Sequence, residues 1–208
     1  MKNINFGDII MQKDIKEGEI WQLKKSSVDV IRKLVYLAML TALVVVLQLV
    51  VAPNIGAATG LSPALVLIPI VLGVASCGIG AGAWLGAVFS LIVMFDPSTV
   101  PFIEYNLFLT IFLVFVKGMG SGVVAGALFK ELSRFNKYLG VVVAAISAPI
   151  VNTSIFVVGC LLFFREINGL ELYLVFAAKN FALEFVINAV LVPAIHHLLE
   201  VTRILNKR

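Results

Sequence analysis

The chain has 208 residues, of which 61% are hydrophobic and 13% are charged, and its mean hydropathy is +1.05. A soluble domain is close to half apolar and a quarter charged, so this composition excludes a soluble enzyme and indicates an integral membrane protein. The formal charge of +4 is not a nucleic-acid-binding signal, because the basic residues flank apolar segments. No Asp, Glu, Lys or Arg occurs from Leu34 to Phe95.

The apolar segments predict an all-α membrane bundle of six transmembrane helices. The first helix follows Ser-Ser-Val-Asp at 26–29, a candidate capping box, and stops near Pro53. The second and third are short, and one long re-entrant hairpin is the alternative to the boundary between them at "SCGIGAG". The expected helices run roughly over residues 33–52, 62–77, 79–95, 107–129, 139–163 and 171–200.

The basic residues predict how this bundle is oriented. Seven Lys and Arg precede the first helix, three lie between the fourth and fifth, and three follow the sixth, which places 13 of the 16 on one face. The positive-inside rule then puts both termini in the cytoplasm. We expect a polar cytoplasmic segment at 1–32, a six-helix membrane domain at 33–203 and a short cytoplasmic tail at 204–208. The N-terminal segment is either an amphipathic helix on the membrane surface or disordered.

Several polar side chains lie inside the predicted helices. Lys117 stands in the middle of an apolar segment, where a charge costs about 2.5–3.5 kcal/mol on insertion scales. A rise of 1.5 Å per residue places charged or amide groups of three helices in one layer, roughly 12–20 Å below the outer surface. These groups are Lys117, Asn152, Lys179 and Glu184.

This polar layer has a structural and a functional interpretation. In the structural one, Lys117 pairs with Glu184 and the amides bond to neighbouring backbone. In the functional one, the groups line a pocket open to the outside, since ionisable residues within a membrane usually mark a solute pathway. Two lysines against one glutamate leave a positive charge that an anionic ligand would neutralise. The predicted lining residues are Lys117, Asn152, Lys179, Asn180, Glu184, Gln48 and Asn54.

The sequence contains no recognisable catalytic or metal-binding motif. Cys77 and Cys160 lack a CxxC partner, which predicts neither a disulfide framework nor a metal site. HExxH, GxSxG and Walker A patterns are absent from the chain. We therefore expect no enzymatic activity, no metal and no cofactor, and any ATP hydrolysis would belong to partner subunits.

Small residues recur at intervals of four, which lets membrane helices approach closely. The pattern predicts packing within the bundle, docking on another membrane protein, or both, and for Ala38 and Ala42 both remain open. The three series are Gly78, Gly82 and Gly86; Gly118, Gly122 and Gly126; and Ala38 and Ala42.

From Lys33 onward, the chain resembles the substrate-binding S components of energy-coupling-factor (ECF) vitamin transporters. The order of the matching segments across six short spans carries the resemblance more than any one of them. The segments are "KLVYLAMLTALVVVLQ", "GAWLGAVFSLIV", "FVKGMGSGVVAGALFKEL", "APIVNTSIFVVGCLLFF" and "KNFALEFVINAVLVP".

The resemblance implies a multi-pass protein of a bacterial cell membrane that binds a vitamin outside and topples in the lipid bilayer to deliver it inward. It implies a membrane scaffold subunit and two cytoplasmic ATPase subunits as partners, and no nucleic acid. It also implies that the face carrying Ala38 and Ala42 docks on the scaffold. The polar N-terminal segment is longer than the family pattern.

The last two matching segments are most similar to members assigned to pantothenate, which has a carboxylate, an amide and two hydroxyls. This agrees with a pocket that offers positive charge and amides. Phe156, Phe181 and Phe185 leave riboflavin, folate or hydroxymethylpyrimidine open as aromatic alternatives. A stand-alone carrier or channel, and a structural protein without a small ligand, are the competing classes; the lack of a visible repeat weighs against the carrier.

Overall fold

The computed structural model describes residues 27–54 and 65–205, with side chains up to residue 197. The chain separates into two units, Met1–Ala38 and Met39–Arg208, and each is described by itself. Within the described ranges all regular structure is helical and no strand occurs, so the predicted fold class is confirmed at this level. Most of the expected N-terminal segment 1–32 and the end of the tail at 206–208 lie outside the described residues.

The first apolar segment forms a helix of 28 residues, Ser27–Asn54. It therefore begins at Ser27 rather than near residue 33 and runs just past Pro53. Within the second unit this helix contains a π-helical turn, η1 (Leu47–Val51), in which the Ala52 N–H donates a hydrogen bond to the Leu47 carbonyl. The first residue of the candidate capping box, at position 26, is outside the described part.

Two short helices follow, α3 (Leu67–Cys77, 11 residues) and α4 (Ile79–Val93, 15 residues). Gly78 between them has a φ of 92°, in the left-handed region that favours glycine, and this confirms the predicted boundary in "SCGIGAG". α3 is too short to cross a bilayer by itself. The expected second span is thus represented only by α3, since residues 55–64 lie outside the described ranges.

After α4 the chain turns sharply and forms η2 (Pro97–Thr99) and α5 (Val100–Tyr105), at 79° to α4. Asp96 caps this turn, because its carboxylate accepts hydrogen bonds from the Ser98 backbone N–H at 2.9 Å and from the Ser98 hydroxyl at 2.7 Å. The bend makes α4 and α5 a broken span or a re-entrant loop.

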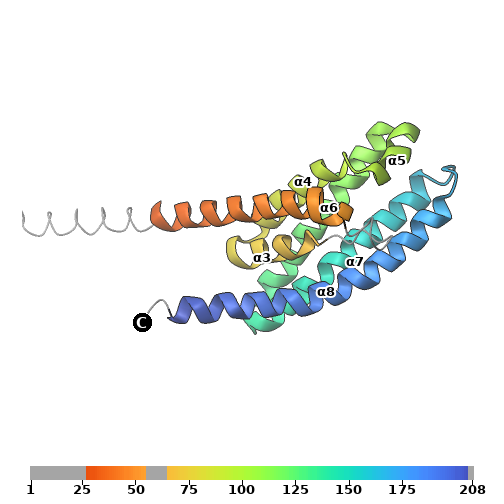
Figure 1. Ribbon diagram of the computed structural model, residues 1–208. Coiled ribbons are helices and arrows are strands. Elements are labelled where there is room, and N and C mark those ends of the chain that lie inside the picture. Colours follow the sequence, from red (N-terminus) through yellow and green to blue (C-terminus); the bar gives the residue numbers. More distant parts are fainter. Residues whose placement is uncertain (1–26, 55–64, 206–208) are drawn as a thin grey trace, which may run out of the picture. The chain divides into compact units, whose positions relative to one another are not determined.

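Three long helices complete the second unit: α6 (Leu107–Leu132), α7 (Lys137–Phe163) and α8 (Leu170–Leu205) (Figure 1). Their bounds confirm the predicted segments 107–129, 139–163 and 171–200 to within a few residues. Asn106 and Asn136 explain two of the starts, since their side chains accept hydrogen bonds from the first-turn N–H groups of α6 and α7.

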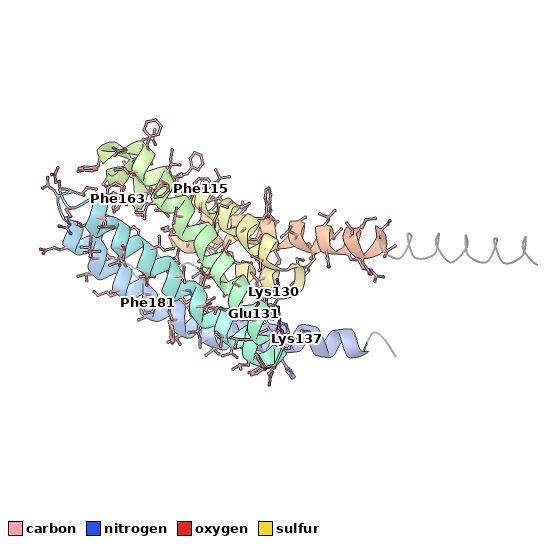
Figure 2. All side chains as sticks on the ribbon, turned by 180° about the vertical axis from the view of Figure 1, so that it is seen from behind. Phe115, Lys130, Glu131, Lys137, Phe163 and Phe181 are labelled. Carbon is pink, nitrogen blue, oxygen red and sulfur yellow. The ribbon has the colours of Figure 1, made fainter. Side chains whose placement is uncertain are left out.

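The described residues contain four helices that are long and apolar enough to cross a membrane, or five if α4 and α5 count as one bent span. The described part of the chain is therefore all-helical and suited to several membrane crossings. Figure 2 shows Lys130, Glu131 and Lys137 together at the end of the unit where α6 passes into α7. Six spans and cytoplasmic termini remain predictions.

α6 packs against both α4 and α7, and α7 packs in turn against α8. Glycines make the α4–α6 contact close: a Cβ on Gly86 would meet the Gly118 carbonyl oxygen, and a Cβ on Gly122 would meet that of Gly82. The Ser90 hydroxyl adds a polar link, at 2.9 Å from the Val114 carbonyl oxygen of α6. At these positions the small residues serve packing within the bundle.

Candidate ligand-binding cavity

A cavity of about 380 Å³ lies within the second unit, and its wall is built from η1, α4, the turn with α5, and helices α6 to α8. This volume falls within the range of small-molecule sites, about 300–1,000 Å³. The wall mixes aromatic rings with polar groups, the usual composition of a site that orients a small solute. The polar wall residues are Gln48, Asp96, Ser98, Thr99, Thr110, Lys117, Asn152, Thr153, Tyr173, Asn180 and Glu184.

Most of the predicted lining residues come together here. Lys179 and Asn54 do not: both are exposed and neither belongs to the cavity wall. Consecutive residues of a helix point about 100° apart, so Asn180 faces the cavity and Lys179 does not. The Asn54 amide instead donates to the Val50 carbonyl at 2.6 Å. The predicted residues that line the cavity are Gln48, Lys117, Asn152, Asn180 and Glu184.

Lys117 brings a cation into this wall. Its ammonium nitrogen lies 5.0 Å from the centroid of the Phe156 ring and 6.0 Å from that of Phe89. Such cation–π contacts partly offset the cost of removing a charge from water. Among the residues that the structure describes, Lys117 forms no ion pair with a carboxylate within 4.0 Å. The direct Lys117–Glu184 ion pair of the structural interpretation is thus not formed, although both side chains line the cavity.

The charges around the cavity differ from the sequence-based expectation. Among the described residues the wall carries one lysine, Lys117, and two acidic residues, Asp96 and Glu184. The predicted excess of positive charge therefore does not hold, because Lys179 points elsewhere and the 79° bend brings in Asp96. The Asp96 carboxylate is already engaged as the cap of η2. Attraction for an anion would thus depend on the local field of Lys117, not on the net charge of the wall.

Two amide side chains of the wall are almost fully buried. Gln48 and Asn152 are each 7% exposed. The Gln48 Oε1 and Asn152 Oδ1 atoms find no hydrogen-bond partner within the described part of the chain. Buried polar atoms in native proteins are usually paired, so these two oxygens are available to a bound solute.

Four aromatic rings of the cavity wall pack against one another. Phe102 of α5 makes edge-to-face contacts with Phe156, Phe164 and Tyr173, at centroid distances of 5.9, 5.3 and 5.1 Å. The hydroxyl of Tyr105, also on α5, lies 3.3 Å from the Glu166 Oε2 atom in the α7–α8 connection. α5 is thereby tied to the ends of both long helices beside the cavity.

Of the three aromatic rings that the sequence offered for stacking on a ligand, only one lines the cavity. Phe156 lines the cavity, whereas Phe181 and Phe185 contact each other at 5.9 Å on α8 and are not part of the wall; Figure 2 locates Phe181 on this helix. The sequence analysis did not identify Phe102, because α5 lies between the expected helices 79–95 and 107–129, where no element was predicted. The motif Asp-Pro-Ser-Thr, a helix-capping pattern, was the available signal.

The two residues expected to dock on a scaffold lie on the Ser27–Asn54 helix. Ala42 belongs to the second unit and is exposed, while Ala38 is the last residue of the first unit. The side chain of Ala42 is therefore accessible on the surface of its own unit.

Apolar helices of membrane-crossing length that converge on a solute-sized cavity define a solute-binding membrane protein. The model of the family described as "ECF transporter, substrate-specific component" matches residues 32–196. The chain therefore belongs to this family of ECF transporter S components, which confirms the resemblance of its segments. Members of the family bind a vitamin or other substrate and in general work with a scaffold and ATPase subunits. Comparisons with curated proteins and with solved structures give no match.

Proposed function

We propose that this S component captures a small anionic vitamin, pantothenate in the first place, at the outer side of a bacterial cell membrane. The observation that carries the proposal is the Lys117 ammonium in the cavity wall, which forms no ion pair within 4.0 Å with a carboxylate of the described residues. A ligand carboxylate placed here would form a charge-assisted hydrogen bond in surroundings of low dielectric constant. Asn152 and Asn180, in the same wall, would bind the amide and hydroxyl groups of pantothenate.

The aromatic wall supports a second candidate ligand. Flat ring systems stack favourably on aromatic side chains. This observation favours riboflavin, folate or hydroxymethylpyrimidine over an aliphatic acid, and folate would also bring a carboxylate for Lys117. The aromatic wall residues are Phe89, Phe102, Phe156, Phe164, Tyr173 and Phe176.

Mass spectrometry of the purified protein tests the ligand directly. We expect pantothenate to be released on denaturation of the protein isolated from cells. Added pantothenate at about 100 times its Kd should stabilise the ligand-free protein by about 2.7 kcal/mol, which thermal unfolding detects. The same measurement with riboflavin, folate and hydroxymethylpyrimidine provides the comparison. Stabilisation by one of these three and none by pantothenate would contradict the pantothenate proposal.

We further propose that the chain has six spans with both termini in the cytoplasm and delivers its ligand inward by toppling on a scaffold subunit. Two cytoplasmic ATPases would hydrolyse ATP, since this chain carries no Walker A sequence. The family membership supports this arrangement over a stand-alone carrier or channel. Uptake by this chain alone in proteoliposomes, without nucleotide, would contradict it.

Replacing Ala42 by tryptophan should abolish copurification with the scaffold and ATPase subunits and leave ligand affinity within threefold. A bulky ring on an exposed small-residue position prevents close approach of a partner helix. Copurification from cells expressing all subunits measures the first effect, and titration calorimetry measures the second. Leu43→Trp is the matched control, because Leu43 is also exposed but points about 100° away on the same helix. Equal loss of partners in both variants would argue against a docking face at Ala42.

A further inference from the structure

We infer that the ligand of this cavity donates hydrogen bonds to Gln48 and Asn152 while its anionic group meets Lys117. The substrate class is then a carboxylic acid that also carries hydroxyl or N–H groups, as opposed to a plain aliphatic acid. This inference rests on the proposed function and narrows the substrate of the same site.

Two amide oxygens in the cavity wall require hydrogen-bond donors on the ligand. The Gln48 Oε1 and Asn152 Oδ1 atoms belong to side chains more than nine-tenths buried, in the wall of one cavity. Neither atom has a hydrogen-bond partner in the described ranges. An acceptor left unpaired in a buried site lowers stability, and a donor on the ligand removes that cost upon binding. A ligand without donors at these points would leave both oxygens unpaired and buried.

The backbone around Gln48 points to the same role. Gln48 lies in the π-helical turn η1, where the Ala52 N–H donates five residues back to the Leu47 carbonyl. Such turns are rare and occur frequently at functional sites, because the wider turn changes the direction in which side chains project. Here the residue in the wide turn is a buried amide that lines the cavity. Gln48 and Asn152 approach the ligand from two separate segments, η1 and α7.

Asn188 offers an internal comparison. It is fully buried on α8, its Nδ2 donates to the Glu184 carbonyl at 2.8 Å, and it does not belong to the cavity wall. Asn188→Leu therefore removes a buried amide from a membrane helix without touching the ligand.

The experiment measures Kd for the full-length chain with pantothenate and with two analogues, one with both hydroxyls replaced by hydrogen and one with a methylated amide nitrogen. The wild-type protein should bind pantothenate about 10-fold to 100-fold more tightly than at least one analogue. Gln48→Leu and Asn152→Leu should each weaken pantothenate binding by a similar factor and abolish one of these preferences. Asn188→Leu should retain the preference of the wild-type protein for pantothenate over the analogues.

Thermal unfolding of the ligand-free variants separates a binding role from a structural one. Leucine in place of Gln48 or Asn152 removes an unpaired buried oxygen, so the Tm should stay the same or rise. A marked fall in the Tm of both variants, together with retained preferences, would show that the amides are structural and would overturn the inference.

The outcomes distinguish the inference from the proposed function. If the wild-type protein binds pantothenate and both analogues equally, the inference fails and the proposed function stands. If it binds none of pantothenate, riboflavin, folate and hydroxymethylpyrimidine, both fail. If it binds riboflavin or hydroxymethylpyrimidine, which carry no carboxylate, the inference fails. If it binds folate, Gln48→Leu and Asn152→Leu must each lower the affinity for folate at least about 10-fold, and unchanged affinity overturns the inference.

Discussion

Replacing Lys117 by methionine should lower the affinity for pantothenate by about 100-fold or more. Methionine keeps the length and the apolar stem of lysine but removes the charge. Truncating one partner of a buried, hydrogen-bonded charge pair costs about 2–5 kcal/mol, which corresponds to this loss. Titration calorimetry on the purified protein measures the Kd.

Ligand-free stability should not fall in this variant. Lys117 forms no ion pair among the described residues, and its contacts are with the rings of Phe156 and Phe89. Methionine packs well against aromatic rings, so the Tm should be unchanged or higher. A parallel fall in affinity and Tm would indicate that Lys117 holds the bundle together and has no separate role in binding.

Lys179→Met is the matched control for the charge. Lys179 is exposed and lies outside the cavity wall, although it is one residue from Asn180, which lines it. We expect its loss to change the Kd less than threefold. A large loss of affinity in Lys179→Met, with little effect in Lys117→Met, would show that Lys179 binds the ligand carboxylate. The sequence analysis allowed this, because it placed both lysines in one layer.

Substituting Gly86 by alanine should destabilise the ligand-free protein by about 3 kcal/mol. A Cβ at this position would meet the carbonyl oxygen of Gly118 and, at 2.9 Å, the Cα atom of Met119. These are backbone atoms of α6, so no side-chain rotation can make room, and α4 and α6 must move apart. Overpacking of a close contact costs about 1–3 kcal/mol, occasionally more. Thermal unfolding should show a Tm lower by about 10 °C.

Gly80→Ala on the same helix provides the control. A Cβ there has no atom within 4 Å, so alanine only gains helix propensity, about 1 kcal/mol at most. Ligand affinity should also fall in Gly86→Ala, because separation of α4 from α6 moves Phe89 away from Lys117. Equal stability of the two variants would show that the α4–α6 contact is looser than the structure indicates.

The sequence predicted the long helices well because their lengths follow from simple physics. In a bilayer every backbone N–H and C=O must be paired within the segment, so about 20 apolar residues form one helix. Asn106 and Asn136 mark the starts of α6 and α7, and Gly169, with a φ of 80°, precedes α8. The short α3 and the bent α4–α5 were predicted less well, since short apolar segments do not specify whether they cross the membrane.

By itself, the sequence determined the class of protein and its long helices, because about 20 apolar residues in a row form one membrane-crossing helix. Only the tertiary structure decided which polar residues meet. The rotation of α8 about its axis depends on its packing against α7, and this selects Asn180 over Lys179 for the cavity. Likewise the 79° bend after α4, which periodicity does not reveal, brings Asp96 and Phe102 into the wall and changes its charge.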